Sequence, residues 1–202
     1  MNPTHRKTTP KVVEGAVLRK NNHVLTSNYW NTVQQDVIID VEKPGKGYKH
    51  FLKKRDVIQF IELIPEWEII SQGLDAIVLT SSDIDCDGYY DNQGVVCISA
   101  WEKEQDLRLS KSYYADHAAL FSRLGIKSSK VNKGYLCEFS VDQIKAYQLL
   151  HILLHELGHH FDRMQTKSKY CSARGENFAE EYAYRIEKQI WFDYQTAFEV
   201  IF

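Results

Sequence analysis

The sequence predicts an α+β fold, in which helices pack against a small mixed sheet. Two short apolar runs, Ala76–Thr80 and Val95–Ser99, have the length and the β-branched content of buried strands. The expected order along the chain is a helix, two strands and then three helices, which is typical of an α+β fold. The 202 residues, 44% of them hydrophobic and 26% charged, fit one such domain.

Residues 1–48 are predicted to form an N-terminal extension, and residues 49–202 the main domain. Short apolar runs between residues 12 and 41 are interpreted as strands of the extension. Its first eleven residues are basic and are expected to be flexible. They contain too few positive charges to predict a nucleic-acid-binding arm.

Charge and hydropathy exclude several functions. The formal net charge of -2 creates no general attraction for nucleic acid or for an anionic membrane. No apolar stretch approaches the roughly 20 residues that span a bilayer, and the N-terminus lacks the apolar core of a secretory signal. We therefore expect a cytoplasmic protein. The four scattered cysteines contain no C-x-x-C pair, which argues against a zinc ribbon. The oligomeric state stays open.

The first half of the main domain is expected to hold one helix and a strand pair. Apolar residues at helical spacing in residues 49–63 predict an amphipathic helix, which Pro65 ends. The runs Ala76–Thr80 and Val95–Ser99 are interpreted as two strands of a hairpin across a polar loop, residues 81–92.

The second half is expected to be helical. Residues 112–124 have helical character, and Ser140 to Gln143 form a capping-box pattern. That pattern predicts a helix that begins at Ser140 and continues to about Met164. After a polar loop, a last helix should run from about Glu176 to Trp191 or beyond.

The segment from His155 to His159 reads H-E-x-x-H and carries the strongest chemical signal of the chain. Residues four apart share a helix face, so both imidazoles should point at one spot. Two neutral imidazoles suit Zn²⁺, which prefers nitrogen and sulfur ligands in a tetrahedral shell. Glu156 would lie beside that spot, where a carboxylate can take a proton from a water activated by the metal.

A third protein ligand is needed for a catalytic zinc site, and the last helix offers several acids. Its residues Glu176-Asn177-Phe178-Ala179-Glu180, together with the H-E-x-x-H segment, resemble the gluzincin branch of the zincin metallopeptidases. The resemblance implies that Glu176 binds zinc and that Glu180 orients His155. Because Asp is frequent where Glu180 stands, the two glutamates could exchange roles.

The resemblance further implies a compact zincin-like fold and a zinc-dependent metallopeptidase, with Glu156 as general base. Val95–Ser99 is similar to the edge strand that pairs with an extended peptide or protein substrate in that family. Five residues are candidates for stabilising the oxyanion: Tyr170, Arg174, Tyr182, Tyr184 and His160. Two alternatives are a catalytically weak zincin-fold binding or regulatory module, and a toxin or effector protease with a single protein target.

Other polar residues have simpler interpretations. His151 lies one turn before His155, but three successive histidines on a straight helix cannot converge on one ion. We therefore expect it to be buried or at the edge of the cleft, and His160 to meet solvent or a carboxylate. The Asp83-x-Asp85-x-Asp87-Gly88 segment resembles half of a calcium loop, but Gly94 stands where such a loop has Glu, so an acidic hairpin loop is the simpler interpretation.

Overall fold

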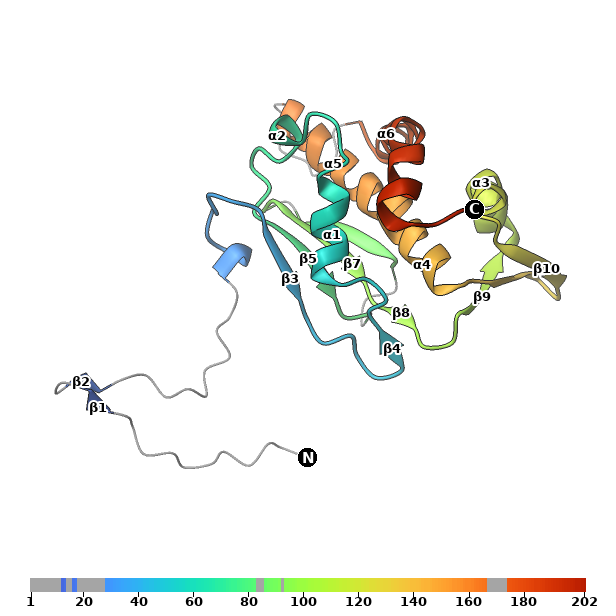
Figure 1. Cartoon of the computed structure of the whole chain (residues 1–202), viewed down its shortest axis with the longest axis horizontal. Helices are drawn as coiled ribbons and strands as arrows, with labels where there is room; N and C mark the ends of the chain where they lie inside the picture. Colours follow the sequence, from blue (N-terminus) through green and yellow to red (C-terminus); the bar gives the residue numbers. More distant parts are fainter. Residues whose placement is uncertain (1–11, 14–15, 18–27, 83–85, 92, 167–173) are drawn as a thin grey trace.

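The computed structural model describes residues 12–13, 16–17, 28–82, 86–91, 93–166 and 174–202. It confirms the α+β class, because helices cover small sheets (Figure 1). The helices are η1 (Asn28–Trp30), α1 (Lys54–Ile61), α2 (Trp67–Ile70), α3 (Lys111–Arg123), α4 (Val141–Tyr147), η2 (Gln148–Leu153), α5 (Leu154–Gln165) and α6 (Glu176–Phe198). The strands are β1 (Val12–Val13), β2 (Ala16–Val17), β3 (Ile38–Val41), β4 (Tyr48–Lys49), β5 (Ala76–Thr80), β6 (Gly88–Asp91), β7 (Val95–Ser99), β8 (Trp101–Glu102), β9 (Asp106–Ser110), β10 (Lys127–Val131) and β11 (Gly134–Glu138).

The central sheet has the strand order β3-β5-β7-β6. Strands β3, β5 and β7 are parallel, and β6 is antiparallel to β7. Every residue of β5 and β7 is buried, as expected for parallel strands covered on both faces. The prediction of a β5–β7 hairpin is therefore wrong. The hairpin partner of β7 is β6, which lies in the stretch predicted to be a polar loop.

This strand order also corrects the predicted edge strand. Val95–Ser99 pairs with β5 on one side and with β6 on the other, so its backbone cannot accept an added substrate strand. Among the described residues, the edge next to the H-E-x-x-H helix is β6. Strand β6 was not predicted, because its short sequence, GYYD, shows no clear alternation of apolar and polar residues.

Strand β3 belongs to the central sheet, since Ile38 to Val41 pair in register with Ala76 to Leu79. The predicted boundary between extension and main domain, at residue 48, therefore separates β3 from the sheet to which this strand is hydrogen-bonded. Strands β1 and β2 pair only with each other among the described residues.

A second, antiparallel sheet has the order β10-β11-β9 and lies beside α3 (Figure 1). This second sheet was not predicted, because β10 is largely polar and exposed. In β9, alternate residues are only partly buried. The short pair β4–β8 is antiparallel as well.

The H-E-x-x-H segment lies on a continuous helical rod made of α4, η2 and α5. The capping box is confirmed, because Ser140 Oγ accepts from the Gln143 N–H at 3.2 Å and Gln143 Oε1 accepts from the Ser140 N–H at 2.8 Å. The rod ends at Gln165, close to the predicted Met164. The turn η2 is π-helical, a form that is frequent at functional sites.

Helix α6 packs along α5 through Gly158, the second variable residue of the H-E-x-x-H segment (Figure 1). A Cβ atom at Gly158 would lie 2.9 Å from Ala179 Cα and 3.1 Å from Ala179 O. Such distances leave no room for a side chain at residue 158. Because glycine has none, the backbones of α5 and α6 can approach each other closely. This contact brings the first turns of α6 to the two histidines.

No helix among the described residues combines the length and the apolar character that crossing a lipid bilayer requires.

Candidate metal centre

The structure brings His155, His159 and Glu176 together as sequence analysis predicted. The Nε2 atoms of the two histidines are 3.2 Å apart, and Glu176 Oε2 lies 3.1 Å from His155 Nε2 and 3.3 Å from His159 Nε2. A tetrahedral zinc ion with ligands at about 2.0–2.1 Å has ligand atoms about 3.3–3.4 Å apart. The three atoms therefore form a face close to the size that zinc requires, and the donor set fits this metal.

Each ligand is positioned by local structure. His155 and His159 are one helical turn apart on α5, which places their rings on one face. Glu176 is the first residue of α6, directly after Gly175, whose φ of +77° favours glycine. The Glu176 side chain is 77% exposed and has room to move toward a bound ion.

Glu180 lies behind this face, one turn further along α6. Its Oε2 accepts a hydrogen bond from His155 Nδ1–H at 3.1 Å, which leaves the Nε2 lone pair free for a metal. Burial alone would raise the pKa of Glu180, but the hydrogen bond from His155 and nearby His151 lower it to about 2. The distances thus support Glu176 as the metal ligand and Glu180 as the carboxylate that orients His155. They do not favour the alternative in which the two glutamates exchange these roles.

Glu156 is buried beside the two histidines, with 7% of its surface exposed. Burial raises the pKa of this carboxyl group to about 7, against the lowering effects of His155 and of a hydrogen bond from the Tyr90 backbone. A carboxylate with a pKa near neutrality is well suited to proton transfer. It lines a hollow of about 290 Å³ together with β6 and both candidate histidine ligands.

Strand β6 reaches this hollow because residue 88 is glycine. A Cβ atom at Gly88 would lie 2.5 Å from Ile152 Cγ2, 2.9 Å from Cys97 O and 3.4 Å from Glu156 Cγ. A side chain at this position would push the strand away from the helical rod. Gly88 therefore allows an edge strand to pass directly over the candidate general base.

A second group of potential ligands lies next to the first. His117 on α3, His151 on η2 and Glu180 on α6 place nitrogen and oxygen atoms within 4.8 Å of one another. His151 is 4% exposed, which confirms the expectation of a buried residue, and burial lowers its pKa to about 4. His117 was not among the predicted site residues, because no local pattern connects it to His151, 34 residues away.

Two of the candidates for stabilising an oxyanion, Arg174 and Tyr182, line neither of the hollows beside Glu156. The Arg174 Nε donates to Asp162 Oδ1 at 2.6 Å, and Tyr182 is buried. Tyr184 remains, since it lines a hollow of about 600 Å³ together with Glu156, although its hydroxyl hydrogen-bonds Glu180 in this structure. Tyr170 lies outside the described residues.

His160 does not meet solvent or a carboxylate, so that expectation is wrong. It is completely buried, with Nδ1 3.3 Å from the Tyr90 hydroxyl and Nε2 3.1 Å from Gln72 O. The i+5 offset from His155 turns it toward the core side of α5. His160 is thus a structural residue that holds β6 and α2 against the rod.

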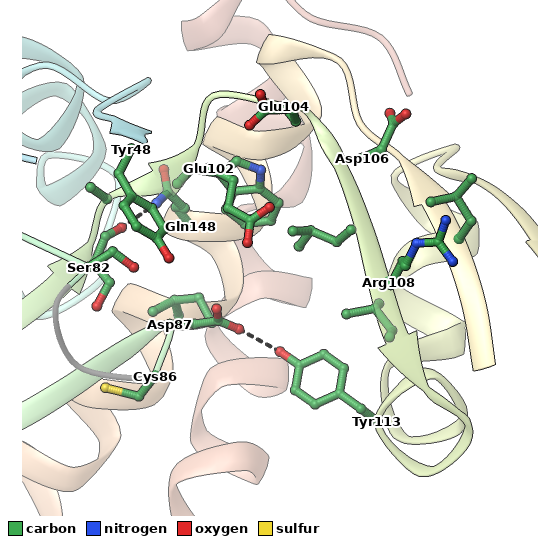
Figure 2. Close-up of a pocket in the computed structure, with 17 residues that line it drawn as sticks. Tyr48, Ser82, Cys86, Asp87, Glu102, Glu104, Asp106, Arg108, Tyr113 and Gln148 are labelled. Atoms are coloured by element: carbon green, nitrogen blue, oxygen red, sulfur yellow. Dashed lines mark hydrogen bonds between the residues drawn. The ribbon is translucent and has the colours of Figure 1, made fainter. Parts of the chain in front are cut away.

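A larger groove of about 1050 Å³ adjoins these hollows (Figure 2). Among the described residues, four carboxylates and a single guanidinium line it: Asp87, Glu102, Glu104, Asp106 and Arg108. At its boundary the Tyr113 hydroxyl donates to Asp87 Oδ2 at 2.7 Å, as Figure 2 shows. Asp87 and Tyr113 also line the hollow that contains Glu156, so the two spaces are neighbours.

The predicted acidic loop with a partial calcium pattern falls mostly outside the described residues, because residues 83–85 are not among them. Asp87 is described, and its carboxylate accepts the hydrogen bond from Tyr113.

Comparisons of the chain with protein-family models, with curated proteins and with solved structures found no match.

Proposed function

We propose that this protein is a zinc-dependent peptidase that hydrolyses peptide bonds. The observation that carries the proposal is the joint position of His155, His159 and Glu176, with atoms 3.1–3.3 Å apart, beside the buried carboxyl group of Glu156. Three nitrogen and oxygen ligands with an open fourth direction are typical of catalytic rather than structural zinc sites.

Each residue of the site has a separate role in the proposed hydrolysis. A zinc ion held there would supply a Lewis acid that polarises a carbonyl group and makes water more acidic. Glu156 takes a proton from the attacking water and then delivers it to the leaving amine. Glu180 holds the His155 ring and its tautomer through Nδ1. Tyr184 is the candidate donor to the developing oxyanion.

We infer that an extended peptide or protein substrate lies along β6 rather than along β7. An edge strand offers main-chain hydrogen bonds to an added strand, and β6 lines the hollow that holds Glu156. A substrate that continues into the larger groove would pass the four carboxylates and the guanidinium that the described part of the chain places there. We expect basic side chains on that side of the cleaved bond.

A mixed peptide library, incubated with the zinc-loaded chain and analysed by mass spectrometry, tests the proposal. Wild type should cleave peptides, and Glu156→Gln should retain one zinc in this site while kcat falls by about 100- to 10,000-fold, because proton transfer is lost. A Glu156→Gln variant that hydrolyses peptides like wild type would remove the catalytic role. It would favour a binding or regulatory module.

Matched glutamate variants on α6 test the third ligand. Glu176→Gln should weaken zinc binding at His155 and His159 more than Glu180→Gln, because Glu176 faces the Nε2 atoms of both histidines. Glu181→Gln is the control, since Glu181 is an exposed acid on the same helix outside the site. Equal zinc affinity in Glu176→Gln and Glu181→Gln would assign the third ligand elsewhere.

A further inference from the structure

We propose that His117, His151 and Glu180 form a second binding site for a divalent cation that prefers imidazole ligands, such as zinc. The proposal concerns cation binding and does not require hydrolysis at the first site. The two Nε2 atoms are 3.1 Å apart, and Glu180 Oε2 lies 3.9 Å from His151 Nε2. The nitrogen separation is close to the distance of about 3.3–3.4 Å between two ligands of a tetrahedral zinc ion.

The ring of His117 is already oriented for this task. Its Nδ1–H donates to the Tyr113 carbonyl oxygen at 2.8 Å, so the lone pair of Nε2 points toward His151. A hydrogen bond from the second ring nitrogen to a carbonyl is the usual support of a histidine that binds a metal. The helical i to i+4 spacing of Tyr113 and His117 on α3 makes this hydrogen bond local.

Stacked tyrosines hold both rings in place. His117 stacks on Tyr113 with ring centroids 4.2 Å apart, and His151 stacks on Tyr147 at 5.4 Å. The hydroxyl groups of the two tyrosines hydrogen-bond each other. Because the supporting rings are linked, the two histidines keep their relative position before any cation arrives, which lowers the entropic cost of binding.

Glu180 connects the second site to the first. The same oxygen, Oε2, that accepts from His155 Nδ1 also faces His151. It supplies the negative charge that a cation between two neutral imidazoles needs. The hollow of about 600 Å³ in front of these residues leaves room for water to complete the coordination shell. A cation here would therefore lie beside the cation of the first cluster, with Glu180 as its own ligand and as the support of His155 in the first cluster.

Zinc stoichiometry tests the proposal. The full chain is stripped with a chelator, and zinc binding is measured by competition with a chromophoric chelator and by elemental analysis after gel filtration. Wild type should bind two zinc ions. His117→Phe, which keeps the stacked ring but removes both nitrogens, should bind one and lose roughly 100-fold or more in affinity for the other. His151→Phe should behave in the same way and provides an independent variant.

Variants of the first cluster keep the two sites distinguishable. His159→Ala should lose the first zinc ion and retain the second, whereas His50→Ala should retain both, because His50 contacts Glu42 O outside either cluster. A wild-type chain that binds a single zinc ion, lost in His159→Ala, would overturn the second site and leave the first intact. Two zinc ions in both His117→Phe and His151→Phe would also overturn it.

Discussion

The two histidine clusters lie side by side but are built in different ways. In the first, His155 and His159 come from one turn of α5, and a single carboxylate from α6 completes the group. In the second, His117, His151 and Glu180 come from α3, η2 and α6. The first cluster therefore needs one contact between helices, and the second needs three elements to dock correctly.

Both clusters depend on how α6 is placed, because Glu176 and Glu180 are one turn apart on this helix. The contact at Gly158 places α6 against α5 and so controls the first cluster. The contacts that hold α3 control the second. Arg123 of α3 donates to Glu187 of α6 at 2.5 Å, and Gln143 of α4 donates to Leu124 O and Gly125 O at the end of α3. Single substitutions at Gly158, Glu187 and Gln143 remove these contacts separately and so test each cluster.

The largest effect is expected from Gly158→Ala. Alanine in a helix interior normally stabilises by about 1 kcal/mol relative to glycine. Here the added methyl group meets the Ala179 backbone at 2.9 Å, so the free energy of unfolding should fall by about 3 kcal/mol. Chemical denaturation measures this change, and zinc affinity at the first cluster should fall with it.

The clash at Gly158 is with backbone atoms, which makes a sharp control possible. Ala179→Gly removes only the Ala179 methyl group and should not rescue Gly158→Ala. If Gly158→Ala were more stable than wild type, helix propensity would dominate, and the close contact of α5 with α6 would not explain the first cluster.

The second prediction concerns the pH dependence of stability through Glu187, which connects α6 to α3. Burial raises its pKa to about 7, and the opposing effect of Arg123 is smaller. The ion pair favours the charged form, but burial prevails because Arg123 is 38% exposed, Glu187 is 1% exposed, and Glu187 Oε1 has no hydrogen-bond partner among the described residues. A carboxyl pKa that is raised on folding stabilises the fold at low pH, and this stabilisation is lost as pH rises from about 4.5 through about 7.

Glu187→Gln should remove that dependence. The free energy of unfolding of wild type, relative to Glu187→Gln, should fall on the order of 2 kcal/mol between pH 4.5 and pH 8. Denaturant titrations at several pH values measure the difference. A difference that rises with pH would mean that the ion pair with Arg123 prevails over burial.

The smallest effect is expected from Gln143→Ala. This side chain both completes the capping box of α4 and donates to the end of α3. Its loss should lower the free energy of unfolding by about 1 kcal/mol and weaken the second cluster more than the first. Ser140→Ala is the matched control, because it removes the cap without the contact to α3, and zinc titration separates the two variants. Equal weakening of both clusters in Gln143→Ala would contradict a specific role for α3.

The sequence pattern predicts the helices of the candidate site well, because helical periodicity is local. The helix that carries the two histidines, its capping box at Ser140 and the helix that begins at Glu176 are all found in the fold. The pattern does not predict the strand pairing, whether the partners are distant in sequence, as in β5–β7, or adjacent, as in the hairpins β6–β7 and β10–β11. The strands Ala76–Thr80 and Val95–Ser99 were identified, but their parallel pairing was not, because the alternation of residues does not reveal the neighbour of a strand.

The sequence by itself determined that His155 and His159 share one face with Glu156 beside them, because the period of a helix is a local property. Only the tertiary structure decided that β6 borders the site, that Glu180 supports His155 through Nδ1, and that His117 meets His151. These relations depend on close backbone contacts at Gly88 and Gly158 and on the docking of α3. Such contacts arise from packing between distant segments, which no local pattern of residues encodes.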